Sequence, residues 1–84
     1  MNSKHRKTLA AVFAKQIRRN IAYRDVESLL RALNCAKLEG EGSRVEFSRD
    51  TSRLQLHRPH PGKEIKEYQV KRLQAFLLEI GVKP

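Results

Sequence analysis

Residues 44–57 read RVEFSRDTSRLQLH and decide the fold, because they contain two short stretches in which polar and apolar side chains alternate. In residues 44–47, and again in residues 53–57, the alternation has the period of two that is typical of a half-buried strand. The Arg-Asp-Thr-Ser sequence at residues 49–52 has the composition of a turn. The stretch therefore predicts a β-hairpin whose apolar face is formed by Val45, Phe47, Leu54 and Leu56.

The register of this hairpin decides which polar side chains share its other face. If Phe47 lies opposite Leu54, residues 49–52 form a four-residue turn. The same register sets Arg44 opposite His57. We expect the apolar face to point inward, because the flanking helices have apolar stripes to bury. The outer face would then display Arg44, Glu46, Arg53, Gln55 and His57.

The segment before the hairpin has the pattern of a helix followed by a strand. Residues 24–34 place their apolar side chains at helical spacing, and Asn34 tolerates the left-handed conformation that often ends a helix. Residues 35–39 follow as a short strand, and the Gly-Glu-Gly sequence at residues 40–42 makes a flexible turn before the hairpin.

After the hairpin, two prolines and Gly62 interrupt regular structure. Residues 70–80 then have apolar side chains at helical intervals, and Gly81 stands where a helix C-cap is expected. The order α-β-β-β-α predicts an α+β fold in which both helices cover one face of a three-stranded antiparallel sheet. Tyr23 and Tyr68, each near the start of a helix, are predicted to be packing residues rather than base-stacking platforms.

The first twenty residues carry six basic side chains and no acidic one, so we predict a basic N-terminal arm at residues 1–20 and a domain at residues 21–84. Leu9, Val12, Phe13 and Ile17 would lie on one face of a helix in the arm. Three uses of such a helix compete: binding a phosphate backbone, packing on a partner or on the body, and targeting to an organelle.

Charge and composition narrow the class of protein. The 84 residues contain 18 Lys and Arg against 9 Asp and Glu, a formal net charge of +9, so nucleic acid is the first partner to consider. The single Cys35 excludes an internal disulfide, and the dispersed histidines have no metal-ligand spacing, so we expect no metal and no cofactor. No apolar run approaches the length of a membrane span. We expect a protein of the reducing cytoplasm.

Two short motifs carry a resemblance to a known family. The sequence His60-Pro61-Gly62-Lys63-Glu64-Ile65 precedes the last helix, and Gly42-Ser43 stands at the start of the second strand. In this order and spacing they resemble the HicA family of bacterial toxin-antitoxin systems over about residues 21–84. The resemblance implies a fold like that of double-stranded-RNA-binding domains, a ribonuclease toxin that cleaves mRNA, and a HicB-like antitoxin partner.

The chain departs from the family at one position. The family usually has its catalytic histidine directly after Gly-Ser or one residue later, and here those positions hold Arg44 and Val45. Two explanations compete. Either His57, opposite Arg44, has taken over the role of the histidine, or the chain binds RNA without cutting it. A third hypothesis, a DNA-binding protein, lacks the helix pair of a helix-turn-helix.

If the chain is an endoribonuclease, we expect cleavage by transesterification without a metal. His57 would be the base or the acid, and His60 is the second candidate, although it could instead only shape the loop. The alternative for His57 is an exposed strand residue without a task. Guanidinium groups clamp phosphates well, so Arg44 is also a candidate catalytic residue. The predicted RNA-binding residues are Arg44, Arg53, Arg58 and Lys63.

Overall fold

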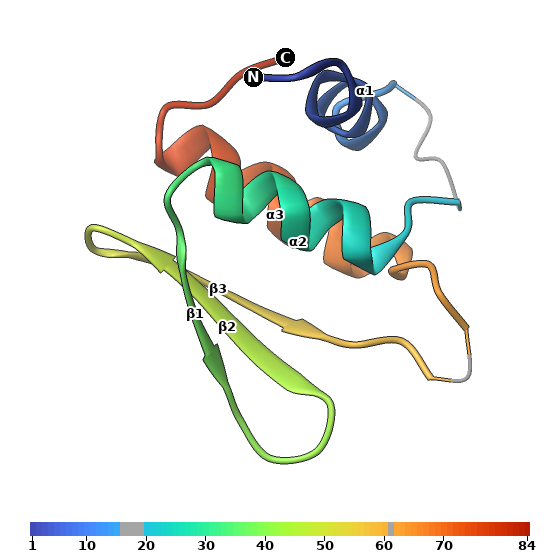
Figure 1. The fold of residues 1–84 in the computed structure, drawn as a ribbon, viewed down its shortest axis with the longest axis vertical. Helices are drawn as coiled ribbons and strands as arrows, with labels where there is room; N and C mark the ends of the chain where they lie inside the picture. Colours follow the sequence, from blue (N-terminus) through green and yellow to red (C-terminus); the bar gives the residue numbers. More distant parts are fainter. Residues whose placement is uncertain (16–19, 61) are drawn as a thin grey trace.

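The computed structural model describes residues 1–15, 20–60 and 62–84. Within these residues the chain forms three helices and a three-stranded antiparallel sheet in the order β1-β2-β3 (Figure 1). The predicted α+β fold and the order α-β-β-β-α after residue 20 are confirmed. The elements are α1 (Ser3–Val12), α2 (Tyr23–Ala32), β1 (Ala36–Glu39), β2 (Arg44–Arg49), β3 (Ser52–His57) and α3 (Glu67–Glu79).

The hairpin of β2 and β3 has the predicted register. Phe47 lies opposite Leu54, and Arg44 lies opposite His57. The predicted turn at residues 49–52 is confirmed in its position, because Ser48 pairs with Arg53. Arg49 also pairs with Ser52, so only Asp50 and Thr51 lie between the paired residues. The turn can be this tight because Asp50 adopts a positive φ of 54°, a conformation that aspartate tolerates better than most residues.

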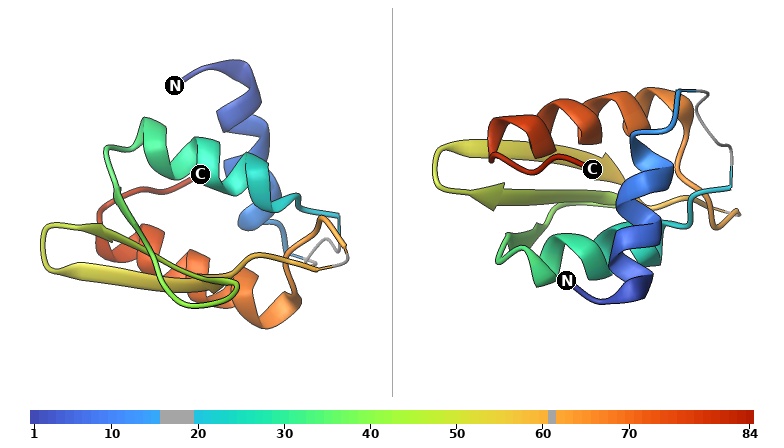
Figure 2. Two further views of the ribbon diagram at one scale, coloured as in Figure 1. Left: turned by 60° about the horizontal axis from the view of Figure 1, so that its bottom comes forward. Right: turned by 90° about the horizontal axis from the view of Figure 1, so that it is seen from above.

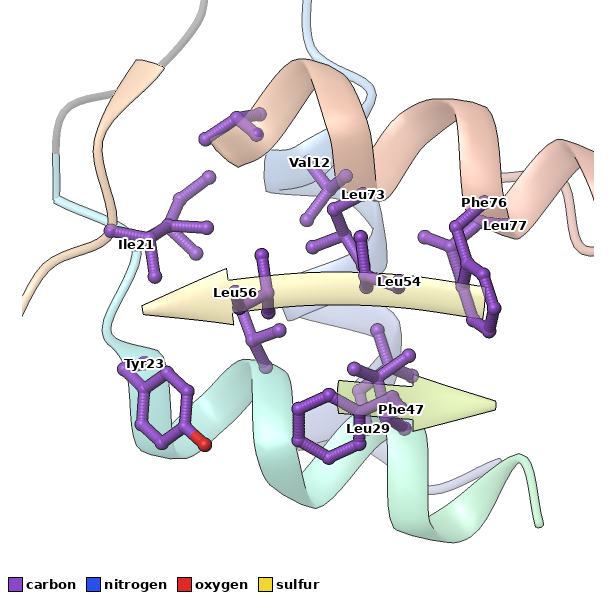
Figure 3. Packing of buried hydrophobic residues seen from close by; sticks show 14 of the residues in the cluster. Val12, Ile21, Tyr23, Leu29, Phe47, Leu54, Leu56, Leu73, Phe76 and Leu77 are labelled. Carbon is purple, nitrogen blue, oxygen red and sulfur yellow. The ribbon is translucent and has the colours of Figure 1, made fainter. Parts of the chain in front are cut away.

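Both predicted helices, α2 and α3, cover the same face of the sheet (Figures 1 and 2). They end as predicted, since Asn34 and Gly81 follow them with φ values of 62° and 82°. The apolar positions of the hairpin point inward and join the apolar stripes of the helices in one cluster (Figure 3). Its largest fully buried side chains are Phe47, Phe76, Leu29, Leu30, Leu56, Leu73 and Leu77.

The helix α1 packs on the body and forms a third layer, lying over α2 and α3 on the side away from the sheet (Figures 1 and 2). Its Val12 side chain is fully buried. Gln74 of α3 donates a hydrogen bond of 2.7 Å from Nε2 to the carbonyl oxygen of Val12. On the other side, His5 Nε2 lies 2.7 Å from Ser28 Oγ of α2. Packing is therefore the use that Ser3–Val12 shows, whereas Ile17 lies outside the described residues.

Candidate functional site

A hollow of about 290 Å³ lies where the end of β3 approaches the start of α3. It brings His57 and His60 together, although a proline and an arginine separate them in the sequence. The hollow thus contains both histidines that the sequence offered as proton-transfer groups. The residues that line it are Ser43, His57, Arg58, Pro59, His60, Lys66, Tyr68 and Gln69.

A serine in the turn directly before β2 holds the ring of His57. The Oγ atom of Ser43 lies 3.3 Å from Nδ1 of His57, and both side chains are exposed. The backbone N–H of Arg58 donates to the carbonyl oxygen of Ser43 at 2.8 Å, which extends the hairpin ladder by one step beyond the pair of Arg44 and His57. With Nδ1 held in this way, Nε2 lies on the opposite edge of an exposed ring.

Gln69 connects the two elements that form the hollow, and sequence reasoning missed it. Its side chain is only 2% exposed. Nε2 donates to the carbonyl oxygen of His57 at 3.1 Å, while Oε1 accepts from the backbone N–H of Lys66 at 3.0 Å. This fixes the first turn of α3 against the end of β3. The signal that could have revealed it is a glutamine next to the apolar stripe that begins at Val70.

The guanidinium of Arg58 is hydrogen-bonded to groups of its own chain. It donates to Glu39 Oε1 at 2.7 Å and to the carbonyl oxygen of Gly42 at 3.3 Å. The hydrogen bond from Arg58, together with the charge of Lys37, holds the pKa of the Glu39 carboxyl below its ordinary value. Lys37 also pairs with Glu27 of α2, and this hydrogen bond raises the pKa of the Lys37 ammonium. The ion pairs of Glu39 with Lys37 and of Lys37 with Glu27 thus connect the strand end before the Gly40–Gly42 turn to α2.

The other predicted cations lie around the hollow rather than in it. Arg44 is exposed and lines a second hollow of about 230 Å³ on the outer face of the sheet. Arg53 is also exposed, and its Nη1 atom lies 3.9 Å from Oε2 of Glu46. Lys63 lines a third hollow of about 480 Å³ to which Arg58 also contributes. The structure therefore brings His57, His60 and Arg58 together, and it does not place Arg44, Arg53 or Lys63 in the same hollow.

The prediction for the two tyrosines is half right. Tyr23 is 8% exposed and packs in the core, as expected, but Tyr68 is 46% exposed and lines the hollow. The apolar stripe of α3 runs through Val70, Leu73 and Leu77, and Tyr68 lies outside it.

A family model described as "HicA toxin of bacterial toxin-antitoxin" matches residues 23–82. The chain belongs to the HicA toxin family. It is therefore the toxin of a toxin-antitoxin system, and its partner is an antitoxin. Comparison with curated proteins and with solved structures found no match.

In this HicA protein the two positions after Gly-Ser face opposite sides of the sheet. Arg44 points to the outer face of the sheet, whereas Val45 is 1% exposed and belongs to the core. A histidine at position 45 of this HicA protein would be buried among leucines. The imidazole that stands beside the Gly-Ser turn comes instead from β3, because His57 contacts Ser43.

Residues 1–15, 20–60 and 62–84 contain no cluster of three or more His, Cys, Asp and Glu side chains arranged to hold a metal ion. No helix within the same residues is long and apolar enough to cross a membrane.

Proposed function

We propose that this HicA toxin binds mRNA and cleaves it by a metal-independent transesterification in the hollow between β3 and α3. The observation that carries the proposal is the pairing of two histidines, His57 and His60, in one hollow whose rim includes the family's Ser43. A net charge of +9 favours a polyanionic substrate.

His57 is the general base in this proposal. In the tautomer whose Nδ1–H donates to Ser43 Oγ, the lone pair of Nε2 is available to accept a proton. Nε2 removes the proton of a ribose 2′-OH, and the 2′-oxygen attacks the adjacent phosphorus. The bond from phosphorus to the 5′-oxygen breaks, and His60 donates the proton that this leaving group needs. The products are a 2′,3′-cyclic phosphate and a 5′-OH end.

The surrounding cations hold the substrate. Arg44 lies opposite His57 on β2, so the two residues are one strand spacing apart in the sheet, and in this proposal the Arg44 guanidinium binds the scissile or a neighbouring phosphate. Arg53 and Lys63 contact phosphates farther along the strand. Arg58, which already binds Glu39, adds positive charge at the floor of the hollow and positions Ser43.

Cleavage of matched substrates tests the proposal. The purified toxin, without its partner and with EDTA present, is incubated with a labelled RNA and with DNA of the same sequence. We expect cleavage of RNA only, because the attacking group is the 2′-OH. His57→Ala and His60→Ala should each reduce the rate by about a hundredfold or more. His5→Ala, which changes the histidine on α1, is the matched control. If the His57→Ala and His60→Ala proteins both cleave RNA at the parent rate, the proposed site is disproved.

A second candidate function is RNA binding without cleavage, and the arginine at position 44 favours it because a family histidine is usual there. In this case RNA is bound with a strong dependence on salt and stays intact.

The antitoxin partner is proposed to be HicB-like. Co-expression with the neighbouring antitoxin gene should relieve growth arrest, whereas the His57→Ala toxin should cause no arrest if cleavage is the toxic activity.

A further inference from the structure

Tyr68 is an exposed aromatic ring on the rim of the proposed active hollow. The sequence has five aromatic residues, all within the described ranges, and Tyr68 is the exposed one among them. It lines the same hollow as His57 and His60. Neither the apolar core nor the proposed proton transfers use this ring.

A cation accompanies the ring. The Cζ atom of Arg72, one helical turn later on α3, lies 5.2 Å from the centroid of the Tyr68 ring. A guanidinium at this distance makes a cation–π contact and restricts the orientation of the ring. An oriented ring loses less conformational freedom when a ligand stacks on it.

The backbone under Tyr68 is fixed relative to His57. Its chain neighbour Gln69 is buried and donates to the carbonyl oxygen of His57. On the same turn, Val70 is fully buried against the core. The ring therefore stays in a constant place beside the position where the scissile phosphate would lie.

We infer that Tyr68, supported by Arg72, is a stacking subsite for the nucleobase next to the phosphate that His57 and His60 act on. The inference rests on the proposed function, because it requires RNA in the hollow. Base faces stack on aromatic rings and on guanidinium planes without regard to sequence. The subsite would thus position single-stranded RNA while adding little sequence preference of its own.

Binding measurements with and without bases test the subsite. The protein carries His57→Ala so that the RNA stays intact, and EDTA is present. Fluorescence anisotropy then gives the dissociation constant for a labelled single-stranded oligoribonucleotide and for an abasic oligomer with the same phosphates. We expect Tyr68→Ala to weaken binding of the normal RNA about tenfold or more and to leave the abasic oligomer within about twofold. Tyr68→Phe keeps the ring and should bind like the Tyr68 protein.

The control variant is Leu78→Ala, which removes another exposed apolar side chain of α3. Thermal unfolding of each variant verifies that it is folded. Equal affinity of Tyr68→Ala and Tyr68 proteins for normal RNA would overturn the subsite and leave the proposed function intact. An equal loss on normal and abasic RNA would also overturn it, since the ring would then act on the backbone or on the fold. If the Tyr68 protein binds no RNA at all, the proposed function fails with it.

Discussion

The hydroxyl oxygen of Ser43 lies 3.3 Å from Nδ1 of His57, although the two residues are 14 positions apart in the sequence. The antiparallel ladder makes this contact possible, because Arg44 pairs with His57 and Ser43 bonds to the next residue, Arg58. A serine of the family's Gly-Ser motif therefore orients a histidine supplied by a different strand.

Ser43→Ala should lower kcat for RNA cleavage about tenfold and leave KM nearly unchanged, because losing one hydrogen bond to the ring of the proposed base costs about 1.4 kcal/mol. In the proposed mechanism Ser43 positions the base and does not bind substrate, so the KM is the informative quantity. Steady-state kinetics on a labelled RNA measures both constants. Ser48→Ala, on β2, is the control. A rise in KM with constant kcat would mean that Ser43 binds substrate instead.

Replacing the buried Gln69 by Leu should destabilise the fold by about 1–3 kcal/mol, because the carbonyl oxygen of His57 and the N–H of Lys66 would each lose a partner. Urea titration gives the free energy of unfolding. Gln55→Leu, at an exposed position on β3, should change this free energy by no more than about 0.5 kcal/mol. Similar small effects of both substitutions would show that the Gln69 hydrogen bonds contribute little.

The ion pair of Glu39 and Arg58 should make stability depend on pH. The pKa of Glu39 in the folded protein is lowered, first by the hydrogen bond from Arg58 and then by Lys37. The pair therefore adds stability above the pKa of Glu39 in the unfolded chain, and this contribution is lost as the pH falls through the lower pKa of the folded state.

Glu39→Gln isolates this contribution. The difference in free energy of unfolding between the variant and the parent protein should be largest near neutral pH, shrink in acid, and also shrink in high salt. Glu41→Gln, in the neighbouring turn, is the control because the pKa of Glu39 does not depend on it. A difference that stays constant across the acid range would contradict the prediction.

Val12→Ala should lower the free energy of unfolding by roughly 2 kcal/mol, because it removes a fully buried side chain of α1 and leaves a cavity over α2 and α3. Thermal or urea unfolding measures the change. Arg6→Ala, on the exposed side of the same helix, should have almost no effect. If Val12→Ala also left the free energy of unfolding unchanged, α1 would not unfold cooperatively with the rest of the domain.

The sequence predicts the hairpin well because one physical constraint fixes it. Val45 and Leu56 must both face the core, and a slip of one residue would turn every apolar side chain of one strand to the outside. The position of His57 opposite Arg44 follows from that constraint. Asn34 and Gly81 were predictable for a similar reason, since few residues adopt a positive φ without strain.

The contacts of the site were beyond such reasoning. Whether Arg58 binds a phosphate or Glu39 depends on the path of the Gly40–Gly42 turn, which alternation does not specify. The buried role of Gln69 depends on how β3 and α3 approach each other. A basic amphipathic helix such as α1 can pack on the rest of its own chain, pack on a partner protein or bind a phosphate backbone. The sequence pattern is the same for these three uses, so only the position of the helix in space distinguishes between them.

The placement of the two chain ends has a practical consequence. Both termini lie on the side of the molecule that carries α1, away from the sheet (Figure 1). A tag or surface linker attached at either end would hold the protein by its helical layers. In a protein immobilised in this way, the outer face of the sheet, which carries the exposed Arg44 and Arg53, would stay accessible for binding measurements with RNA.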